Sequence, residues 1–128
     1  MYYALVPESF PGAENGILCA RIEMQDHDGW MAIGFSEDGS MTGSRKIMPT
    51  TAVVGVPLAG TVLKYKLNAK DKNIVAEMSK AQQTLRDTSI ALSKDGTAIM
   101  TFTKLLKERD EVEILESGIN RFISAKVR

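Results

Sequence analysis

The stretch TSIALSKDGTAIMTFTKLL, residues 88–106, decides the fold. Apolar and polar residues alternate on both sides of the pair Asp95-Gly96, and this is the period of a β-strand, whose successive side chains point to opposite faces. An Asp-Gly pair between two such runs favours a hairpin, because a type I′ turn needs positive φ at both central residues. We therefore predict two antiparallel strands joined by a type I′ turn at residues 95–96.

The rest of the chain repeats this strand pattern. In ILCARIEM, residues 17–24, Leu18, Ala20, Ile22 and Met24 alternate with Cys19, Arg21 and Glu23. GWMAIGFS, residues 29–36, is apolar on both faces, which is typical of a central strand. Further strands are expected in TTAVVGVP (50–57), TVLKYKL (61–67), DEVEILESG (110–118) and NRFISAKV (120–127). About seven or eight short strands with turns between them predict an all-β fold, an antiparallel β-sandwich.

Within this sandwich some residues carry specific expectations. Met100 and Phe102 share one face of their strand, as do Leu63 and Tyr65, and both pairs are expected in the core. The segment 74–87, IVAEMSKAQQTLRD, is open between a short helix, an irregular connector and an edge strand. The charged residues at 104 and 107–111 have mixed signs, which is typical of a solvated turn.

Length and composition describe one ordinary domain, residues 1–128. The chain has 44% apolar residues, 25% charged residues and a formal net charge of zero. A neutral chain argues against nucleic acid as the partner, since nucleic acid demands a basic surface. No apolar run approaches the ~20 residues that span a bilayer, and the N-terminal residues lack the pattern of a signal peptide. The chain is therefore either cytoplasmic as it stands or a piece of a longer protein.

Chemically reactive motifs are scarce. The single cysteine, Cys19, excludes an internal disulfide and is expected to be a packing residue. The sequence lacks the nucleophile elbow of hydrolases, the P-loop and the dinucleotide-binding glycine motif. The chain is therefore not expected to be an enzyme on its own, and any redox chemistry would come from a cofactor.

One methionine stands in an unusual place. GFSEDGSMTGS, residues 34–44, surrounds Met41 with glycine and polar or acidic residues, whereas methionine normally fills gaps in a core. Either Met41 folds back onto the edge of the sheet, or its thioether is a ligand. Gly39 and Gly43 remove side chains on both sides of Met41, so that this loop could approach a cofactor closely.

Six fragments in order resemble the DOMON family, named after the N-terminal region of dopamine β-monooxygenase. They are GWMAIGFSEDGSMTGS, VVGVP, GTVLKYKL, QQTLRDTSIAL, GTAIMTFTKLL and GINRFISA, and the resemblance spans residues 17–125. It implies an immunoglobulin-like β-sandwich. It also implies a b-type haem held between a loop methionine and a late histidine, and electron transfer with a redox partner or a fused transmembrane cytochrome b domain. Other members bind no haem and recognise sugars or other ligands.

The resemblance places Met41 at the position of the axial methionine, with Trp30 as a wall of the haem site or as a core residue. A thioether is a soft neutral ligand that raises the potential of haem iron. The histidine that completes the pair follows the strand matching NRFISA in the family, and no residue here matches it. The only histidine, His27, stands at the opposite end of the strand that precedes Met41, so it is expected to be a solvated loop residue.

The final strand runs directly into Arg128. We therefore expect an incomplete sandwich that lacks its last strand or strands, with the axial histidine in a continuation. The family implies an extracellular or lumenal location, with membrane association through such a segment. Two alternatives stay open: a haem-free module that binds carbohydrate or protein, and a fragment without independent function.

Overall fold

The computed structural model describes residues 2–6, 16–25, 29–36, 50–67, 75–109, 111–114 and 121–126. These residues form nine strands and one short 3-10 helix. The strands are β1 (Tyr2–Val6), β2 (Ile17–Met24), β3 (Met31–Ser36), β4 (Thr50–Val56), β5 (Thr61–Leu67), β6 (Val75–Glu77), β7 (Arg86–Leu92), β8 (Ala98–Leu105) and β9 (Arg121–Lys126), and the helix is η1 (Lys80–Gln82).

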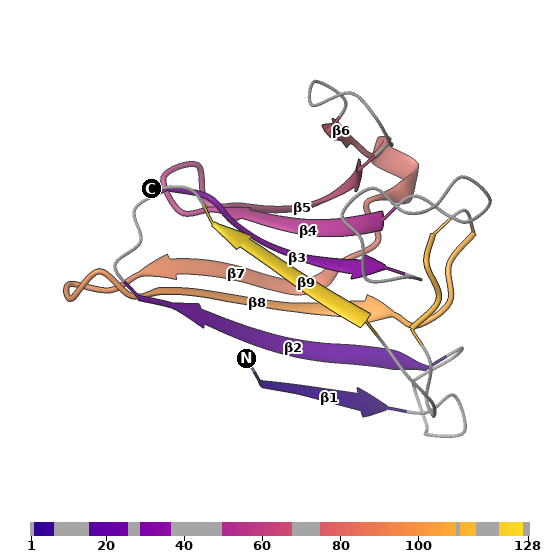
Figure 1. The fold of residues 1–128 in the computed structure, drawn as a ribbon, viewed down its shortest axis with the longest axis horizontal. Helices are drawn as coiled ribbons and strands as arrows, with labels where there is room; N and C mark the ends of the chain where they lie inside the picture. Colours follow the sequence, from indigo (N-terminus) through magenta and orange to yellow (C-terminus); the bar gives the residue numbers. More distant parts are fainter. Residues whose placement is uncertain are drawn as a thin grey trace.

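The strands form two antiparallel sheets that pack face to face (Figure 1). One sheet has the order β1-β2-β8-β7 and the other has the order β6-β5-β4-β3-β9. The chain changes sheet between β2 and β3, between β6 and β7, and between β8 and β9. The predicted antiparallel β-sandwich is confirmed. β3 pairs with both β4 and β9 and is buried along its whole length, so the prediction of a central strand is also correct.

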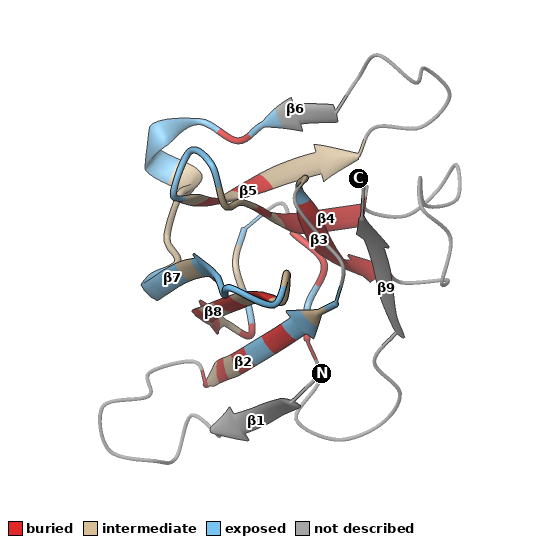
Figure 2. Cartoon of the chain, turned by 90° about the vertical axis from the view of Figure 1, so that its left-hand side faces the viewer, coloured by how far each residue is buried: buried red, intermediate tan, exposed pale blue. Residues whose placement is uncertain are grey.

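The core lies between the two sheets, where the buried residues of β2, β3, β4 and β8 meet (Figure 2). The alternating burial of β2 and β8 follows the period of their apolar residues. Met100 and Phe102 are buried in this core, as predicted. The sheets approach closely at Gly55, where an added Cβ would lie 2.7 Å from Met100 Sδ and 2.9 Å from Ile90 Cδ1.

The hairpin between β7 and β8 is present, but its turn differs from the prediction. Gly96 has a φ of 87°, whereas Asp95 is not among the described residues with positive φ. The Gly96 N–H donates to the Ser93 carbonyl at 3.1 Å, and the Ser93 N–H donates to the Thr97 carbonyl at 2.9 Å. This is the longer hairpin loop in which a type I turn is followed by one left-handed residue, so only the glycine needs positive φ.

The prediction for β5 assigned the wrong face to the core. Val62 and Lys64 are buried, while Leu63 and Tyr65 are only half-buried. Lys64 lies opposite Val53 of β4, a core residue, so the face that carries lysine points inward. The apolar pair Leu63 and Tyr65 therefore lies on the outer face.

The open segment 74–87 contains all three structures considered for it, the helix being a single 3-10 turn. β6 is an edge strand that pairs with β5, and residues 83–85 form an irregular connector after the 3-10 turn of η1. Among the described residues, no helix has the length and apolar character needed to cross a membrane.

Candidate functional site

The charge run after β8 is not a solvated turn. Lys104 is fully buried and Glu111 is only 5% exposed, while Lys107 and Arg109 between them are exposed. The interpretation of the run as a uniformly exposed turn is therefore wrong. Residues 108 and 111 turn inward because two buried ammonium groups need compensating charge, and an unpaired buried charge costs several kcal/mol.

Two lysines and two glutamates form a closed ring, the Lys–Glu quartet, consisting of Lys64, Lys104, Glu108 and Glu111. The Lys64 ammonium lies 3.0 Å from Glu108 Oε2 and 2.8 Å from Glu111 Oε2. The Lys104 ammonium lies 3.1 Å from Glu108 Oε1 and 3.2 Å from Glu111 Oε1. Each carboxylate thus bridges a lysine of one sheet and a lysine of the other.

The connector before β7 completes the coordination of Lys64. The ammonium of Lys64 donates a third hydrogen bond, of 2.8 Å, to the Thr84 hydroxyl, and Thr84 itself donates to Glu108 Oε2. All three N–H groups of the ammonium are therefore used. The Gln83 amide fixes the backbone of the same lysine, since it accepts from Lys64 N at 2.8 Å and donates to Lys64 O at 3.0 Å. The side chain of Gln83 thus pairs with the edge of β5 beyond the point where β6 ends.

The two glutamates belong to segment 106–114, which we call the closing segment; residue 110 lies outside the described residues. Leu106, Val112 and Ile114 of this segment are buried in the core. The Ile114 N–H donates to the Leu106 carbonyl at 2.8 Å, so the segment closes on itself. The strand predicted over 110–118 is absent from its described residues 111–114, where Val112, Ile114 and also Glu111 are buried.

The electrostatics of the quartet are dominated by burial and by opposite charge. Burial alone would raise the pKa of Glu108, but the charge of Lys104 and hydrogen bonds from Thr84, Lys64 and Lys104 outweigh it and hold that pKa below its ordinary value. Glu111 Oε1 accepts no hydrogen bond in the described structure, although the Lys104 ammonium lies 3.2 Å away. The angle at this contact is unfavourable, so we regard it as an ion pair without a hydrogen bond.

The quartet lies at one particular end of the sandwich. β3 ends at Ser36 and β4 begins at Thr50, and the stretch between them carries Met41. We call this end of the sandwich the Met41 end. The Lys104 ammonium lies 6.0 Å from the centre of the Phe35 ring, one residue before β3 ends. The Val112 N–H makes a long hydrogen bond of 3.5 Å to the hydroxyl of Thr51, one residue after β4 begins. The quartet and its closing segment thus contact both strand ends that flank Met41.

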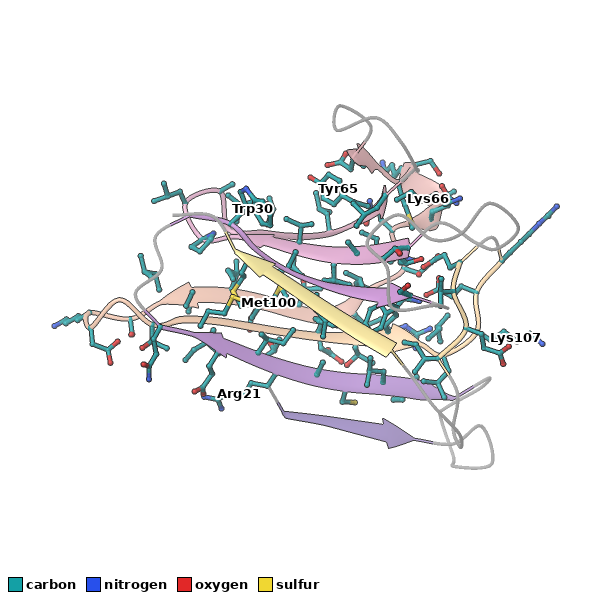
Figure 3. The ribbon with its side chains drawn as sticks, in the orientation of Figure 1. Arg21, Trp30, Tyr65, Lys66, Met100 and Lys107 are labelled. Atoms are coloured by element: carbon teal, nitrogen blue, oxygen red, sulfur yellow. The ribbon has the colours of Figure 1, made fainter. Side chains whose placement is uncertain are left out.

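The predicted site residues fall largely outside the described part of the chain. Met41, Gly39, Gly43 and His27 all lie in the stretches 26–28 and 37–49, which the structure does not describe. Trp30 immediately precedes β3 and is 36% exposed, so it is not the fully buried core residue that one reading expected. In Figure 3 Trp30 lies at the opposite end of the sandwich from Lys107 of the closing segment, and therefore away from the Met41 end.

Sequence reasoning missed the quartet, although one signal pointed to it. Lys104 continues the inward period of Ala98, Met100 and Phe102, so its position on the core face follows from the alternation alone. No comparable local signal marks Lys64, because the neighbouring leucine and tyrosine make the other face of β5 look like the inner one.

The chemistry available to the quartet is structural. The Lys64 ammonium donates to two carboxylates and a hydroxyl, and the Lys104 ammonium donates to Glu108 and to the Leu105 carbonyl. Both ammonium groups are buried and paired with carboxylates, so neither is available as a nucleophile. Among the described residues, no three histidine, cysteine, aspartate or glutamate side chains are arranged to hold a metal ion. Comparisons of the chain with protein-family models, with curated proteins and with solved structures found no match.

Proposed function

We propose that this chain is a DOMON-like β-sandwich module that binds a ligand at its Met41 end and is not an enzyme on its own. The observation that carries the proposal is that the buried Lys–Glu quartet and its closing segment contact both strand ends that flank Met41, with Lys104 at Phe35 and Val112 at Thr51. Binding loops work best when a rigid scaffold fixes their ends. The sequence fragments quoted above supply the family resemblance.

The first candidate ligand is b-type haem, with Met41 as an axial ligand and with Gly39 and Gly43 allowing close approach. Haem would make the module an electron-transfer domain that acts with a redox partner or a fused transmembrane cytochrome b domain. The family resemblance also places such a module in an extracellular or lumenal compartment. The cofactor would supply the redox chemistry, and the chain would supply the ligand and the surrounding wall.

The donor set of residues 1–128 fits a haem with one protein ligand and does not fit a methionine–histidine pair. His27 is the only histidine, and it precedes β3, whereas Met41 follows that strand. The six residues of β3 span about 20 Å, while two axial donors on one iron lie only about 4–5 Å apart. Residues of this chain therefore account for one side of the iron, and the other side is not assigned to any of them.

This single-histidine arrangement favours the second candidate, a haem-free module that binds carbohydrate or protein at the same end. In that case Met41 contributes only apolar contact. The two candidates differ in a property that is easily measured, since only the first gives an iron–porphyrin spectrum that depends on a thioether.

The test is a titration of the purified chain with haemin, followed by reduction. The haem proposal expects a stoichiometric Soret band and a ferrous spectrum that changes in Met41→Ala, with a lower midpoint potential. Met48→Ala, in the same stretch, is the matched control and should leave both unchanged. Failure to bind haemin, or the same spectrum with and without Met41, would overturn the haem proposal. Binding of an oligosaccharide or a protein that Gly39→Trp abolishes would then support the haem-free module.

A further inference from the structure

We propose that the Lys–Glu quartet is an acid-sensitive latch, which keeps the closing segment seated across the Met41 end at neutral pH and releases it in acid. The latch itself is argued from contacts among described residues. Only its consequence for a ligand bound at the Met41 end rests on the proposed function of that end.

The first step is connectivity. Lys64 comes from one sheet and Lys104 from the other, and both glutamates come from the closing segment. The four ion pairs are therefore the polar attachment that joins this segment to both sheets at once. The remaining attachments are the apolar contacts of Leu106, Val112 and Ile114 in the core and single hydrogen bonds to Thr51, Thr84 and the Gly16 carbonyl.

The second step is charge balance. Two ammonium groups and two carboxylates cancel while both glutamates are ionised. Protonation of Glu108 removes one negative charge and leaves one positive charge in excess at fully buried lysines. An uncompensated buried charge is strongly unfavourable, and opening the segment to water removes the penalty.

The third step concerns which groups titrate. Glu108 faces Lys64 of β5, Lys104 of β8 and the Thr84 hydroxyl of the connector, and Glu111 shares its two lysines. The threonine hydroxyl does not titrate, so the contact between Thr84 and Glu108 changes charge only through its carboxylate. Protonation of Glu108 is therefore the change of charge that opens the latch as the pH falls. The lowered pKa of Glu108 agrees with this, because it keeps the latch closed at neutral pH and confines opening to acid.

The fourth step links the latch to the Met41 end. The Lys104 ammonium contacts the ring of Phe35 at the end of β3, and Val112 of the closing segment bonds to Thr51 at the start of β4. Release of the segment removes the second contact and weakens the first. The acid-open state thus loses the contact at the start of β4 and keeps a weaker one at the end of β3.

Hydrogen exchange on the full chain tests the latch without any ligand. Protection factors, corrected for the intrinsic pH dependence of exchange, are measured in a series from neutral pH down to the onset of acid unfolding, because the lowered pKa of Glu108 keeps the latch closed until the pH falls below the ordinary value for a glutamate. We expect protection of the Ile114 and Val112 amides to fall on the order of tenfold or more in acid, while central amides of β3 and β4 keep theirs. Glu108→Gln should show the same loss at neutral pH, and Glu113→Gln, an exposed glutamate on the same segment, should not.

Two results would overturn the latch: unchanged protection of these amides in acid, or loss of protection in the segment and the central strands together. If Glu108→Gln fails to fold, the pH series on the wild-type chain still tests the latch. Haemin binding is measured separately. A latch that opens in a chain that never binds haem contradicts only the haem proposal, whereas haem binding with a segment that does not open contradicts only the latch.

Discussion

The ammonium of Lys64 lies 2.8 Å from Glu111 Oε2, and neither side chain exposes more than 2% of its surface. Lys64 stands in the middle of β5, and Glu111 stands in the closing segment, which follows β8 of the other sheet. The contact therefore ties together parts of the chain that are 47 residues apart. It is one side of a ring in which every charge has two partners of opposite sign, and this completeness allows two lysines to be buried.

The first prediction compares two lysines of the same charge run. Lys104→Met should lower the free energy of unfolding by about 3–5 kcal/mol, because it leaves two buried carboxylates with a single ammonium. Lys107→Met, at an exposed position of the same run, should change it by less than about 0.5 kcal/mol. Urea denaturation of both variants checks this. If Lys104→Met changed the free energy of unfolding as little as Lys107→Met does, the run would be a solvated turn.

The second prediction removes the whole ring. The variant Lys64→Met, Lys104→Met, Glu108→Leu, Glu111→Leu should be within about 1 kcal/mol of wild type or more stable, since apolar residues of similar volume often replace buried ion pairs without loss. If the quadruple variant loses as much stability as the four single substitutions together, the ring stabilises the fold by more than the mutual neutralisation of its buried charges. Thermal and chemical denaturation give the comparison.

The third prediction concerns pH. The pKa of Glu108 is lower in the folded chain than its ordinary value of 4.5, because the charge of Lys104 and hydrogen bonds from Thr84 and the lysines outweigh the effect of burial. This glutamate therefore stabilises the fold fully above its ordinary pKa, and the contribution is lost as the pH falls through the lowered value. The stability difference between wild type and Glu108→Gln should shrink in acid. If the stability difference between the two chains stays constant down to acid unfolding, the pKa of Glu108 is not lowered in the folded chain.

The fourth prediction tests which face of β5 points outward. Burial, the charge of Glu77 and its 3.4 Å hydrogen bond with the Tyr65 hydroxyl raise the pKa of Tyr65 above 10.0. Glu77→Gln should lower that pKa toward the ordinary value without reaching it, because burial is the largest cause and remains. The titration is followed by the absorbance of the phenolate, and Tyr65→Phe identifies the part of that absorbance that comes from Tyr65. If the pKa of Tyr65 is the same in Glu77→Gln as in wild type, the two side chains are not in contact.

The fifth prediction concerns the closest approach of the sheets. Gly55→Ala should cost about 1–3 kcal/mol, because the new methyl group would lie within 3 Å of Met100 Sδ and Ile90 Cδ1. Met100→Val should recover part of the loss in the Gly55→Ala background, while it destabilises the wild type. Additive effects of the two substitutions would show that they do not meet across the core.

Much of the sandwich follows from local pattern, since each strand of a half-buried sheet carries its own period. β2 and β8 alternate cleanly, and β3 is apolar on both faces, so all three are readable without the structure. The face of β5 is not readable locally, because it depends on two glutamates more than forty residues away that neutralise Lys64. Glu108 and Glu111 are three residues apart in a run of mixed charge, and only the fold distinguishes them from the exposed Lys107 and Arg109.

The candidate ligand site follows a different logic. Met41 was singled out by a conflict between an apolar side chain and its polar neighbours, and by family resemblance. The conflict lies within residues 34–44, whereas the resemblance rests on fragments that span residues 17–125. The quartet is recognisable only in the folded chain, where it and the closing segment contact Phe35 and Thr51 on the two sides of the stretch 37–49.

A double-mutant cycle between Lys64 and Glu111 tests the central claim most directly. The single variants Lys64→Met and Glu111→Gln and the double variant are compared with wild type by urea denaturation near neutral pH. A buried, hydrogen-bonded ion pair predicts a coupling free energy on the order of 2 kcal/mol, so that the double variant is clearly less destabilised than the sum of the singles. A coupling near zero, with both singles costing less than about 0.5 kcal/mol, would contradict the buried quartet and the brace that it provides at the Met41 end.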